Sequence, residues 1–588
     1  MKFDKKPMVN WYDPNQLAST GLKTVVSSVF GNFSDRREMQ AALDPDLGYF
    51  DYSDRDDIWI DFISDLGDGF NPTYTMAHLL AKDYLEVKGE KIMRGKILVM
   101  GGDEVYPTPE MHEYRNRLQG PYHAAFPGNR NDPDPPHLFA IPGNHDWYDG
   151  LTNFIKIFLQ KRSLGNWRTQ QSRSYFALKL PHNYWLLGID IQLNADIDIP
   201  QLNYFRKIAK DEIKANDKII IATAEPSWVY KSFSQKSTAH DRFKFFIDKI
   251  IFGKTHLEDP DCFYGGKNES IQVTTILTGD LHHYSHYIEE GVINKKCHLI
   301  TAGGGGAFMH TTHTLKKEIN ASDGYNATLV EPTFPPKSDS IKLGYKNLLF
   351  PFYNITMLLF FGIFHLFNAW LLQVATKNDN ATFMEKAMEI SLFDGGFWEY
   401  MTLIGSTLSH TPSVLALNLL LFVGLLVFTD VKSGRGNWNY IAGALHGMLQ
   451  VANFYFLIWL FSRLNIYTYE LKVDSLQQVL WFSGEMIVIG GVLSGVLFGL
   501  YLLVSGNFLN NHITEASSSF LGEDYKNFVR MHLDANALTI YPIGVKEVVK
   551  NWKDINKGTG KDPIFKGDEI KYDLIEEEPT IISHKNTP

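Results

Sequence analysis

The apolar positions of the chain follow two different patterns. Up to about Lys346, apolar runs of strand length, such as "KILVM", "YWLLGID" and "KIIIATAE", alternate with polar or helical stretches such as "IPQLNYFRKIAKDEIK". Strands that alternate with helices in this way are typical of an α/β domain. Between Leu348 and Val504 the apolar stretches become much longer, and the sequence after them is charged again. The pattern therefore predicts two unlike folding units.

Four of the apolar stretches approach or exceed the length that a helix needs to cross a bilayer, which is about 20 mostly apolar residues. They are Leu348–Ala375, Ser413–Thr429, Tyr440–Phe461 and Val479–Val504. The stretch "FWEYMTLIGSTLSHTPS" before the second one is interrupted by His410 and Pro412, so it is either an interfacial helix or an extension of that span. We predict four crossings, with five as the alternative if this stretch crosses by itself.

These patterns divide the chain into four segments. We expect an N-terminal extension at 1–56, an α/β domain at 57–340, a helical transmembrane domain at 341–508 and a cytoplasmic tail at 509–588. Within the tail, "YKNFVRMHLDANALTIYPIGV" alternates like a hairpin with "DAN" at its turn. We therefore expect the tail to dock on the α/β domain.

Charge and composition indicate which partners and which cellular compartment are compatible with the chain. The net charge is -10 and no basic stripe interleaves with aromatic residues, which argues against nucleic acid as the main partner. The two cysteines, Cys262 and Cys297, show neither a disulfide framework nor CxxC spacing, which fits a reducing compartment. The N-terminal segment lacks the apolar core of a signal peptide, and the lysines and arginines of the short loops slightly favour the inside for both termini. We expect an integral protein of the cell membrane, with the α/β domain and both termini in the cytoplasm.

Polar motifs follow four of the strand-like runs. "SDLGDG" contains Asp65, "GGDEVY" contains Asp103 and Tyr106, "PGNHDWYDG" contains Asn144, His145 and Asp146, and "TGDLHHYSHY" contains Asp280 and His282. Active sites of α/β sheets lie at the carboxyl ends of strands, so these side chains should meet. Each motif alone is weak because Gly-Asp turns are common, but the ordered set indicates a metal centre. Two metal ions bridged by a carboxylate would neutralise a phosphoester and generate a hydroxide nucleophile.

On these motifs the chain resembles the calcineurin-like metallophosphoesterase superfamily over about Trp59–His313, and it looks most like the purple acid phosphatases. Their series reads GDxG, GDxxY, GNH(D/E), His-x-Pro and GHxH. Asp65-Leu66-Gly67, Gly102–Tyr106 and Gly143–Asp146 match the first three motifs, with Ser64 in place of the leading glycine. The resemblance implies a four-layer α/β/β/α sandwich, here followed by an α-helical transmembrane bundle, and hydrolysis of a phosphoester by attack of a metal-bound hydroxide. The order of the transmembrane half is similar to that of a group of membrane-attached phosphoesterases.

The resemblance also implies a first metal site. Its ligands would be Asp65, Asp103, Tyr106 and His282. Tyr106 would bind as a phenolate, because Gly67 stands where most of the superfamily has a histidine ligand. A tyrosinate favours iron at this site. The alternative is that Tyr106 packs as an ordinary core aromatic.

The second metal site departs from the family pattern. Asp103 would bridge to it and Asn144 would bind there, but Ala224 stands where the family has a histidine, and Asp280 replaces the first histidine of GHxH. Glu225, beside Ala224, remains open as a further donor. A carboxylate-rich shell favours Mn, Mg or Fe over Zn, so we expect a divalent or trivalent ion that is held more weakly than the first.

By the same resemblance, His145 would act on the substrate, as a proton donor or as a stabiliser of a phosphoryl oxygen, and Asp146 would orient its ring. Asp68 in the first motif fits a turn residue better than a ligand. His283 and His286 follow the last ligand and either line the substrate mouth or face solvent.

Two further features stay open. The stretch "AGGGGAFMHTTH" is either a phosphate cradle or a place where glycines allow close sheet packing, and His310 or His313 could approach the substrate. His446 and Glu485 are ionisable residues within the apolar spans, where such groups either mark function or form a polar structural pair.

The sequence therefore predicts a membrane-anchored, metal-dependent phosphoesterase. Its partners would be the lipid bilayer and a phosphoester substrate, and a lipid-linked phosphoester is one candidate because the site is tethered near the bilayer. The first alternative is a regulatory or binding protein whose degenerate domain keeps one metal, and Ala224 supports it. The second is a transporter-like membrane domain that its phosphoesterase half regulates, for which His446 and Glu485 are the only indication.

Overall fold

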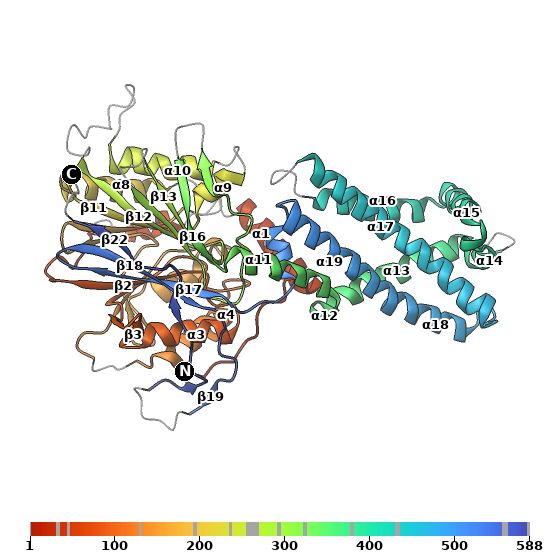
Figure 1. The fold of residues 1–588 in the computed structure, drawn as a ribbon, viewed down its shortest axis with the longest axis horizontal. Helices are drawn as coiled ribbons and strands as arrows, with labels where there is room; N and C mark the ends of the chain where they lie inside the picture. Colours follow the sequence, from red (N-terminus) through yellow and green to blue (C-terminus); the bar gives the residue numbers. More distant parts are fainter. Residues whose placement is uncertain are drawn as a thin grey trace. The chain divides into compact units, whose positions relative to one another are not determined.

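The computed structural model describes residues 2–30, 36–43, 48–128, 132–191, 197–233, 238–253, 270–290, 296–320, 326–376, 381–429, 436–555 and 562–584 (Figure 1). The chain divides into two compact units. The first comprises Met1–Val9, Ser19–Ser340 and Leu521–Pro588, and the second comprises Asn10–Ala18 and Ile341–Phe520. The helical segment is therefore an insertion between two parts of the first unit.

One sheet of the first unit has nine strands among the described residues, in the order β1-β9-β10-β11-β12-β14-β13-β16-β15. They are β1 (Phe50–Asp51), β9 (Phe176–Leu180), β10 (Tyr184–Ile189), β11 (Lys218–Thr223), β12 (Gln272–Thr278), β13 (Tyr284–Glu289), β14 (Cys297–Ala302), β15 (Glu318–Asn320) and β16 (Asn326–Phe334). β10, β11, β12 and β14 pair in parallel, so the carboxyl ends of β11 and β12 meet at one edge. Cys297 on β14 is buried and free, while Cys262 lies outside the described residues.

The second sheet has the strand order β21-β18-β17-β2-β5-β6-β8-β7, with β22 paired to β18. Its strands are β2 (Ile58–Ile63), β5 (Ile97–Met100), β6 (His137–Ala140), β7 (Ser163–Leu164), β8 (Trp167–Thr169), β17 (Lys526–Leu533), β18 (Ala537–Val545), β21 (Asp573–Leu574) and β22 (Thr580–Ser583). β2, β5 and β6 are parallel, which again brings three carboxyl ends to one edge. Two short ribbons complete the strands, β3 (Tyr84–Val87) with β4 (Glu90–Met93) and β19 (Lys553–Asp554) with β20 (Phe565–Lys566).

Alternation along the strands explains why both sheets are buried on both faces. On β11, Ile220 packs into the cluster between the two sheets, whereas Ile219 and Ile221 pack into the cluster on the outer face. On β2, Phe62 faces the other sheet and Ile63 faces outward. Successive side chains of a strand point to opposite faces, so each sheet needs a cover of helices.

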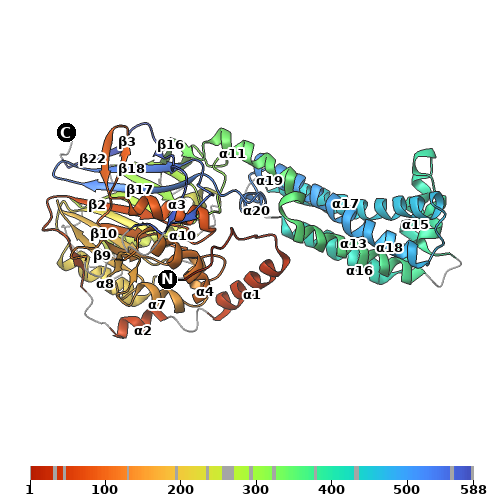
Figure 2. The same cartoon turned by 90° about the horizontal axis from the view of Figure 1, so that it is seen from below.

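The helices form the two outer layers of this unit, above and below the sheets in Figure 1; Figure 2 shows the same unit from below. The outer face of the second sheet packs against α3 (Phe70–Ala81), α5 (Gly120–Ala125) and α7 (Thr152–Phe158), and that of the first against α8 (Ile199–Asp211), α9 (Ser227–Phe233) and α10 (Ala239–Phe245). The remaining helices before the insertion are α1 (Pro14–Phe30), α2 (Arg36–Leu43), α4 (Met111–Glu113), α6 (Asn144–Trp147) and α11 (Lys337–Gly344). The predicted α/β class, with four layers in the order α/β/β/α, is confirmed.

The C-terminal segment completes the second sheet. β17 and β18 form an antiparallel hairpin whose turn is Asp534–Asn536, and the Asp534 carboxylate accepts the backbone N–H groups of Asn536 and Ala537. β17 also pairs with β2, so the blue C-terminal strands lie beside one of the earliest strands in Figure 1. The hairpin predicted from the sequence is therefore present, and it is an integral part of the sheet. The division between units falls at Leu521, which differs from the boundary expected at residue 509.

The second unit is helical. It contains α12 (Phe350–Tyr353), α13 (Ile355–Thr376), α14 (Phe383–Glu389), α15 (Phe397–His410), α16 (Pro412–Phe428), α17 (Asn437–Phe461), α18 (Leu476–Glu485), α19 (Gly491–Phe508) and α20 (Ile513–Ser518). Within the described residues, three helical stretches are long and apolar enough to cross a membrane: Ile355–Thr376, Asn437–Thr468 and Leu476–Phe508. α15 and α16 pass the same test only as a pair, and they are bent by 107° at the break. The helices thus allow three crossings, or four if the bent pair is one span, and a separate fifth crossing by α15 is not supported.

The two ionisable residues in the apolar spans contact different partners. His446 stacks on Tyr501 with ring centroids 4.4 Å apart, and its Nε2 lies 3.2 Å from the Gln450 amide nitrogen. Glu485 accepts a hydrogen bond of 2.6 Å from Asn465. Each therefore belongs to its own polar contact rather than to a His446–Glu485 pair.

Candidate metal centre

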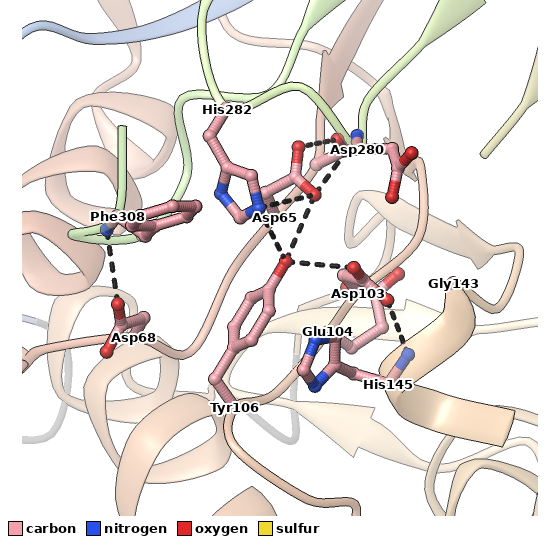
Figure 3. Close-up of polar contacts among 12 residues, drawn as sticks. Asp65, Asp68, Asp103, Glu104, Tyr106, Gly143, His145, Asp280, His282 and Phe308 are labelled. Carbon is pink, nitrogen blue, oxygen red and sulfur yellow. Dashed lines mark hydrogen bonds and ion pairs between the residues drawn. The ribbon is translucent and has the colours of Figure 1, made fainter. Parts of the chain in front are cut away.

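The strand ends of both sheets place the predicted side chains together (Figure 3). Asp65 follows β2, Asp103 follows β5, and Asn144 to Asp146 follow β6 in the second sheet, whereas Asp280 follows β12 in the first. The backbone N–H of Asp280 donates to Asp65 Oδ1 at 3.1 Å, which joins the two sheets at this point. The centre is therefore built from the carboxyl ends of strands in two layers.

The hydroxyl group of Tyr106 lies at the middle of the centre. It donates a hydrogen bond of 2.9 Å to Asp103 Oδ2 and lies 3.2 Å from both Asp65 Oδ1 and His282 Nε2. Tyr106 is 1% exposed. An ordinary core aromatic would place its ring among apolar side chains, but here the phenol oxygen meets three potential metal ligands. The contacts therefore favour the ligand hypothesis over simple packing.

Four of the candidate ligands have a left-handed backbone conformation. The φ angles are 59° at Asp65, 53° at Asp103, 66° at Asp280 and 42° at His282. Non-glycine residues with positive φ are uncommon, and such strained residues cluster at functional sites, where the surrounding structure holds them. The recurrence of this conformation in four residues at three strand ends supports a common functional role.

Glycines allow the backbone to approach these carboxylates closely. A Cβ at Gly143 would lie 2.1 Å from Asp103 Oδ1, and a Cβ at Gly303 would lie 2.2 Å from Asp65 Oδ2. A Cβ at Gly305 would lie 2.6 Å from the Ser64 carbonyl oxygen. The glycine-rich stretch from Gly303 onward therefore packs against the Asp65 loop, which favours the close-packing interpretation over a phosphate cradle.

Burial makes the centre electrostatically costly without a cation. Burial raises the pKa values of Asp65 and Asp103 well above the usual range for aspartate, and repulsion from neighbouring carboxylates raises them further. Burial, followed by the charge of His310, holds the pKa of His282 well below its ordinary value. A neutral imidazole beside carboxylates is the form that binds a metal, and a bound cation would offset the repulsion between them.

Whether these residues can bind a metal ion depends on the chemical types of their donor atoms and on the spacing between them. Within the described ranges, no group of three or more His, Cys, Asp or Glu side chains is spaced to hold a metal ion. The centre, however, also contains the phenol of Tyr106 and the amide of Asn144, whose buried Oδ1 has no hydrogen-bond partner. Its donors touch one another directly, as the Tyr106 contacts show. The donor chemistry therefore fits a hard metal ion, while the spacing is that of a closed hydrogen-bonded cluster.

The orientation of His145 differs from the prediction. His145 Nδ1 lies 2.9 Å from the Pro107 carbonyl oxygen, and the His145 backbone N–H donates to Asp103 Oδ1 at 2.8 Å. The Asp146 carboxylate instead accepts the backbone N–H groups of Gly143 and Glu104, at 2.9 and 3.1 Å, and the hydroxyl of Tyr114. His145 and Asp146 are consecutive residues of α6, and side chains at i and i+1 of a helix do not face each other. Pro107 orients the ring, and Asp146 fixes the loop.

The second metal position has an unexpected neighbour. Ala224 directly follows β11 and has no donor side chain, and its carbonyl oxygen accepts the backbone N–H of Gly279 at 2.9 Å. Asp280 Oδ2 accepts a hydrogen bond from the hydroxyl of Tyr230 on α9. Burial and the charge of Asp280 raise the pKa of Glu225 to about 8. Sequence reasoning missed Tyr230, because nothing in its local pattern marks a tyrosine of a short helix as part of a site.

Lys526 is a second residue that the sequence did not identify. Its buried ammonium group donates to the carbonyl oxygens of Gly306, Ala307 and Phe308 at 2.7, 2.7 and 3.1 Å. It comes from β17, so the C-terminal strand holds the glycine-rich loop beside the centre. The contact is long-range, and no spacing along the chain predicts it.

Asp68 has a structural role, as its turn position suggested. Its two carboxylate oxygens accept the backbone N–H groups of Val9 and Phe308, at 2.8 and 3.1 Å, and thereby tie three segments together. Figure 3 shows the contact with Phe308. The solvent-facing alternative for His283 and His286 is wrong, because both side chains are buried. His286 lies 2.8 Å from Glu576 and 2.9 Å from His298.

His310 and His313, the two histidines of the glycine-rich stretch, have different surroundings. The rings of His282 and His310 have centroids 5.3 Å apart, and His313 Nδ1 lies 3.0 Å from the Ser340 hydroxyl. A role of His310 beside the substrate is compatible with this position, whereas His313 belongs to a contact with α11.

Comparison with known proteins defines the class of this domain. Residues 58–258 match the family of calcineurin-like phosphoesterases. This segment is therefore a calcineurin-like phosphoesterase domain, as the motifs predicted, although the match ends before Asp280 and His282. A solved structure titled "GAP50 the anchor in the inner membrane complex of Plasmodium" is similar at 12% identity and a TM-score of 0.31, over 49% of this chain and 94% of that one. No curated protein matches the sequence.

Proposed function

We propose that the protein is a membrane-anchored, metal-dependent phosphoester hydrolase. The observation that carries this proposal is the position of the Tyr106 hydroxyl, within 3.2 Å of Asp65, Asp103 and His282. The family match over residues 58–258 supports a phosphoesterase, and the three apolar helical stretches support attachment to a membrane. The domain and both termini would lie on the cytoplasmic side.

The donor set divides into two positions. Asp65, Asp103, Tyr106 and His282 would hold the first ion, for which phenolate and carboxylate oxygens favour iron. Asp103 would be shared with a second position that includes Asn144 and Asp280, where oxygen-rich ligation suits Mn, Mg or Fe. When bound, the metals would supply Lewis-acid stabilisation of the phosphoryl oxygens and an activated water.

His145 would handle the proton at the leaving group. Burial lowers the pKa of His145 to about 4, so the neutral ring predominates in the free protein. If Nδ1–H donates to the Pro107 carbonyl, Nε2 is the nitrogen that can exchange a proton. The negative charge of a bound phosphoester would favour protonation of that nitrogen, which prepares it to protonate the departing oxygen.

A metal-reconstitution assay tests this function. The full chain is purified in detergent, stripped with a chelator, reloaded with iron and manganese, and assayed on aryl phosphate mono- and diesters and on a phospholipid in mixed micelles. Metal-dependent hydrolysis that disappears in Asp103→Ala is the expected result. A preference for the micellar lipid would support a lipid-linked substrate. Absence of hydrolysis on all substrates, with metal fully bound, would favour the regulatory protein with a degenerate site.

A further inference from the structure

Among the described residues, Tyr106 and Tyr230 donate their hydroxyl groups to carboxylates that are candidate metal ligands, and of these two only Tyr106 belongs to a predicted motif. Tyr106 donates to Asp103 on one side. Tyr230 donates to Asp280 on the other. Asp280 is joined to the first side through its backbone N–H, which donates to Asp65. Each tyrosine thus contacts a carboxylate that faces the same centre.

The fold explains how Tyr230 reaches this position. β11 and β12 are parallel neighbours, and the hydrogen bond from Gly279 to the Ala224 carbonyl keeps their ends together. α9 begins at Ser227, directly after this strand end, and Tyr230 lies in its first turn. The chain therefore delivers a phenol to Asp280 within six residues of the position where the family motif has an imidazole and this sequence has Ala224.

We infer that Tyr230 is a ligand of the second metal position, where it replaces the imidazole that Ala224 lacks. This inference rests on the proposed metal-dependent function. Metal binding would break the O–H bond of Tyr230, release the proton to solvent and form an oxygen–metal bond in its place. The shell would then contain Tyr230, Asp103, Asn144 and Asp280, a set of hard donors.

Direct contact favours Tyr230 over Glu225 as the missing donor. The Tyr230 hydroxyl is hydrogen-bonded to Asp280, so only a small movement would let both oxygens bind one cation. The Tyr230–Asp280 pair also resembles the Tyr106–Asp103 pair of the first position. In each pair a phenol is hydrogen-bonded to a carboxylate, and a bound metal ion would lie between the two oxygens.

A metal titration of the full chain in detergent tests the inference. Chelator-stripped protein is titrated with Mn²⁺, and the bound ions per chain are counted by mass spectrometry and by the electron paramagnetic resonance of bound Mn²⁺. Wild type should bind two ions. Tyr230→Phe should keep the tighter ion and weaken the second by tenfold or more, since even residues that only support a ligand typically contribute 10–100-fold. Tyr204→Phe is the matched control, because its buried hydroxyl donates to the Gly48 carbonyl elsewhere in the domain, and it should bind like wild type.

A rescue variant distinguishes between two roles of the Tyr230 hydroxyl, as a metal ligand or as a structural hydrogen-bond donor. In Tyr230→Phe combined with Ala224→His, an imidazole stands at the family position and should restore the second ion. Unchanged or tighter second-ion binding in Tyr230→Phe would overturn the inference, the latter by showing that the hydroxyl caps Asp280. If wild type binds one ion, the inference about Tyr230 is overturned, but a single-metal phosphoesterase is still allowed. If wild type binds no ion, the proposed metal-dependent function is contradicted.

Discussion

Arg530 and Asp61 lie 469 positions apart in the sequence and form a two-point ion pair in the core of the phosphoesterase unit. Arg530 Nε lies 2.6 Å from Asp61 Oδ1, and a terminal guanidinium nitrogen lies 2.9 Å from Oδ2. Arg530 is fully buried and Asp61 nearly so. The pair joins β17 to β2, so it attaches the C-terminal strands to the first strand of the sheet.

Removal of the arginine should destabilise this unit strongly. Arg530→Met leaves the Asp61 carboxylate buried without its partner, and loss of one member of a buried pair typically costs about 3–5 kcal/mol. Thermal unfolding followed by tryptophan fluorescence in detergent should show a clear fall in Tm. The double variant Asp61→Leu with Arg530→Met removes both charges and should recover much of the loss. A Tm unchanged in Arg530→Met would mean that the pair does not hold β17 in place.

Tyr106→Phe should remove a visible absorption band. A tyrosinate bound to ferric iron absorbs visible light by charge transfer, so oxidised, iron-loaded wild type is expected to be coloured and the phenylalanine variant colourless. Since only one hydroxyl is lost, far-ultraviolet circular dichroism should stay the same. An iron-loaded wild type without the band would return Tyr106 to the core-packing interpretation.

Asp103→Ala and His145→Ala should both impair hydrolysis but differ in metal content. Asp103 is expected to bridge the two positions, so its loss should lower the number of bound ions as well as activity. His145 is expected to act on the substrate, so its loss should keep the metals and lower kcat by about 10²–10⁴-fold. His313→Ala, whose imidazole contacts Ser340, is the control and should behave like wild type. Full metal and full activity in both variants would contradict the proposed centre.

Glu576→Gln should lower stability in a pH-dependent way. The Glu576 carboxylate accepts hydrogen bonds from Tyr284 at 2.6 Å and contacts His286 at 2.8 Å. Although burial raises the pKa of Glu576, the His286 hydrogen bond and charge and the other hydrogen bonds outweigh it, and the net pKa is lowered. A lowered folded-state pKa means that the stabilisation is present above the unfolded pKa and is lost as the pH falls through the folded value.

The measurement is the difference in Tm between wild type and Glu576→Gln at pH 7 and in acid. Hydrogen bonds to a charged group contribute about 1.5–3 kcal/mol, so the difference should be clear at pH 7 and should shrink below the folded pKa. The exposed neighbour Glu577→Gln should leave Tm unchanged at both values. A difference that is constant with pH would exclude the carboxylate charge as its cause.

Local sequence was sufficient to find the strand-end motifs but not the contacts between distant segments. Asp65, Asp103 and Asp280 follow apolar strands, and the geometry of parallel sheets brings such ends together whatever the rest of the chain does. Tyr230 and Lys526 reach the centre through a short helix and a C-terminal strand, and neither local sequence carries a signal for it. Long-range pairings of this kind depend on the whole topology.

In the helical unit, too, some features could be predicted from local sequence and others could not. Length and apolarity identified α13, α17 and α19 with their extensions, because a bilayer imposes both properties on a spanning helix. The break between α15 and α16 follows from Pro412, which is favoured at the first position of a new helix and cannot continue the preceding one. The 107° bend itself is set by packing and could not be read from the sequence.

The pairing of β2 with β17 also limits how many times the chain can cross a membrane between these two strands. One strand precedes the helical insertion and the other follows it, yet they are neighbours in one sheet. A bilayer cannot pass between two hydrogen-bonded strands of a folded domain, so the chain must leave and re-enter this unit on the same side of the membrane. Any such path crosses an even number of times. Of the counts that the described helices allow, three crossings would place the C-terminal hairpin on the side opposite β2. Four crossings, with the bent α15–α16 pair counted as one broken span, would return Lys526 and Arg530 to the sheet.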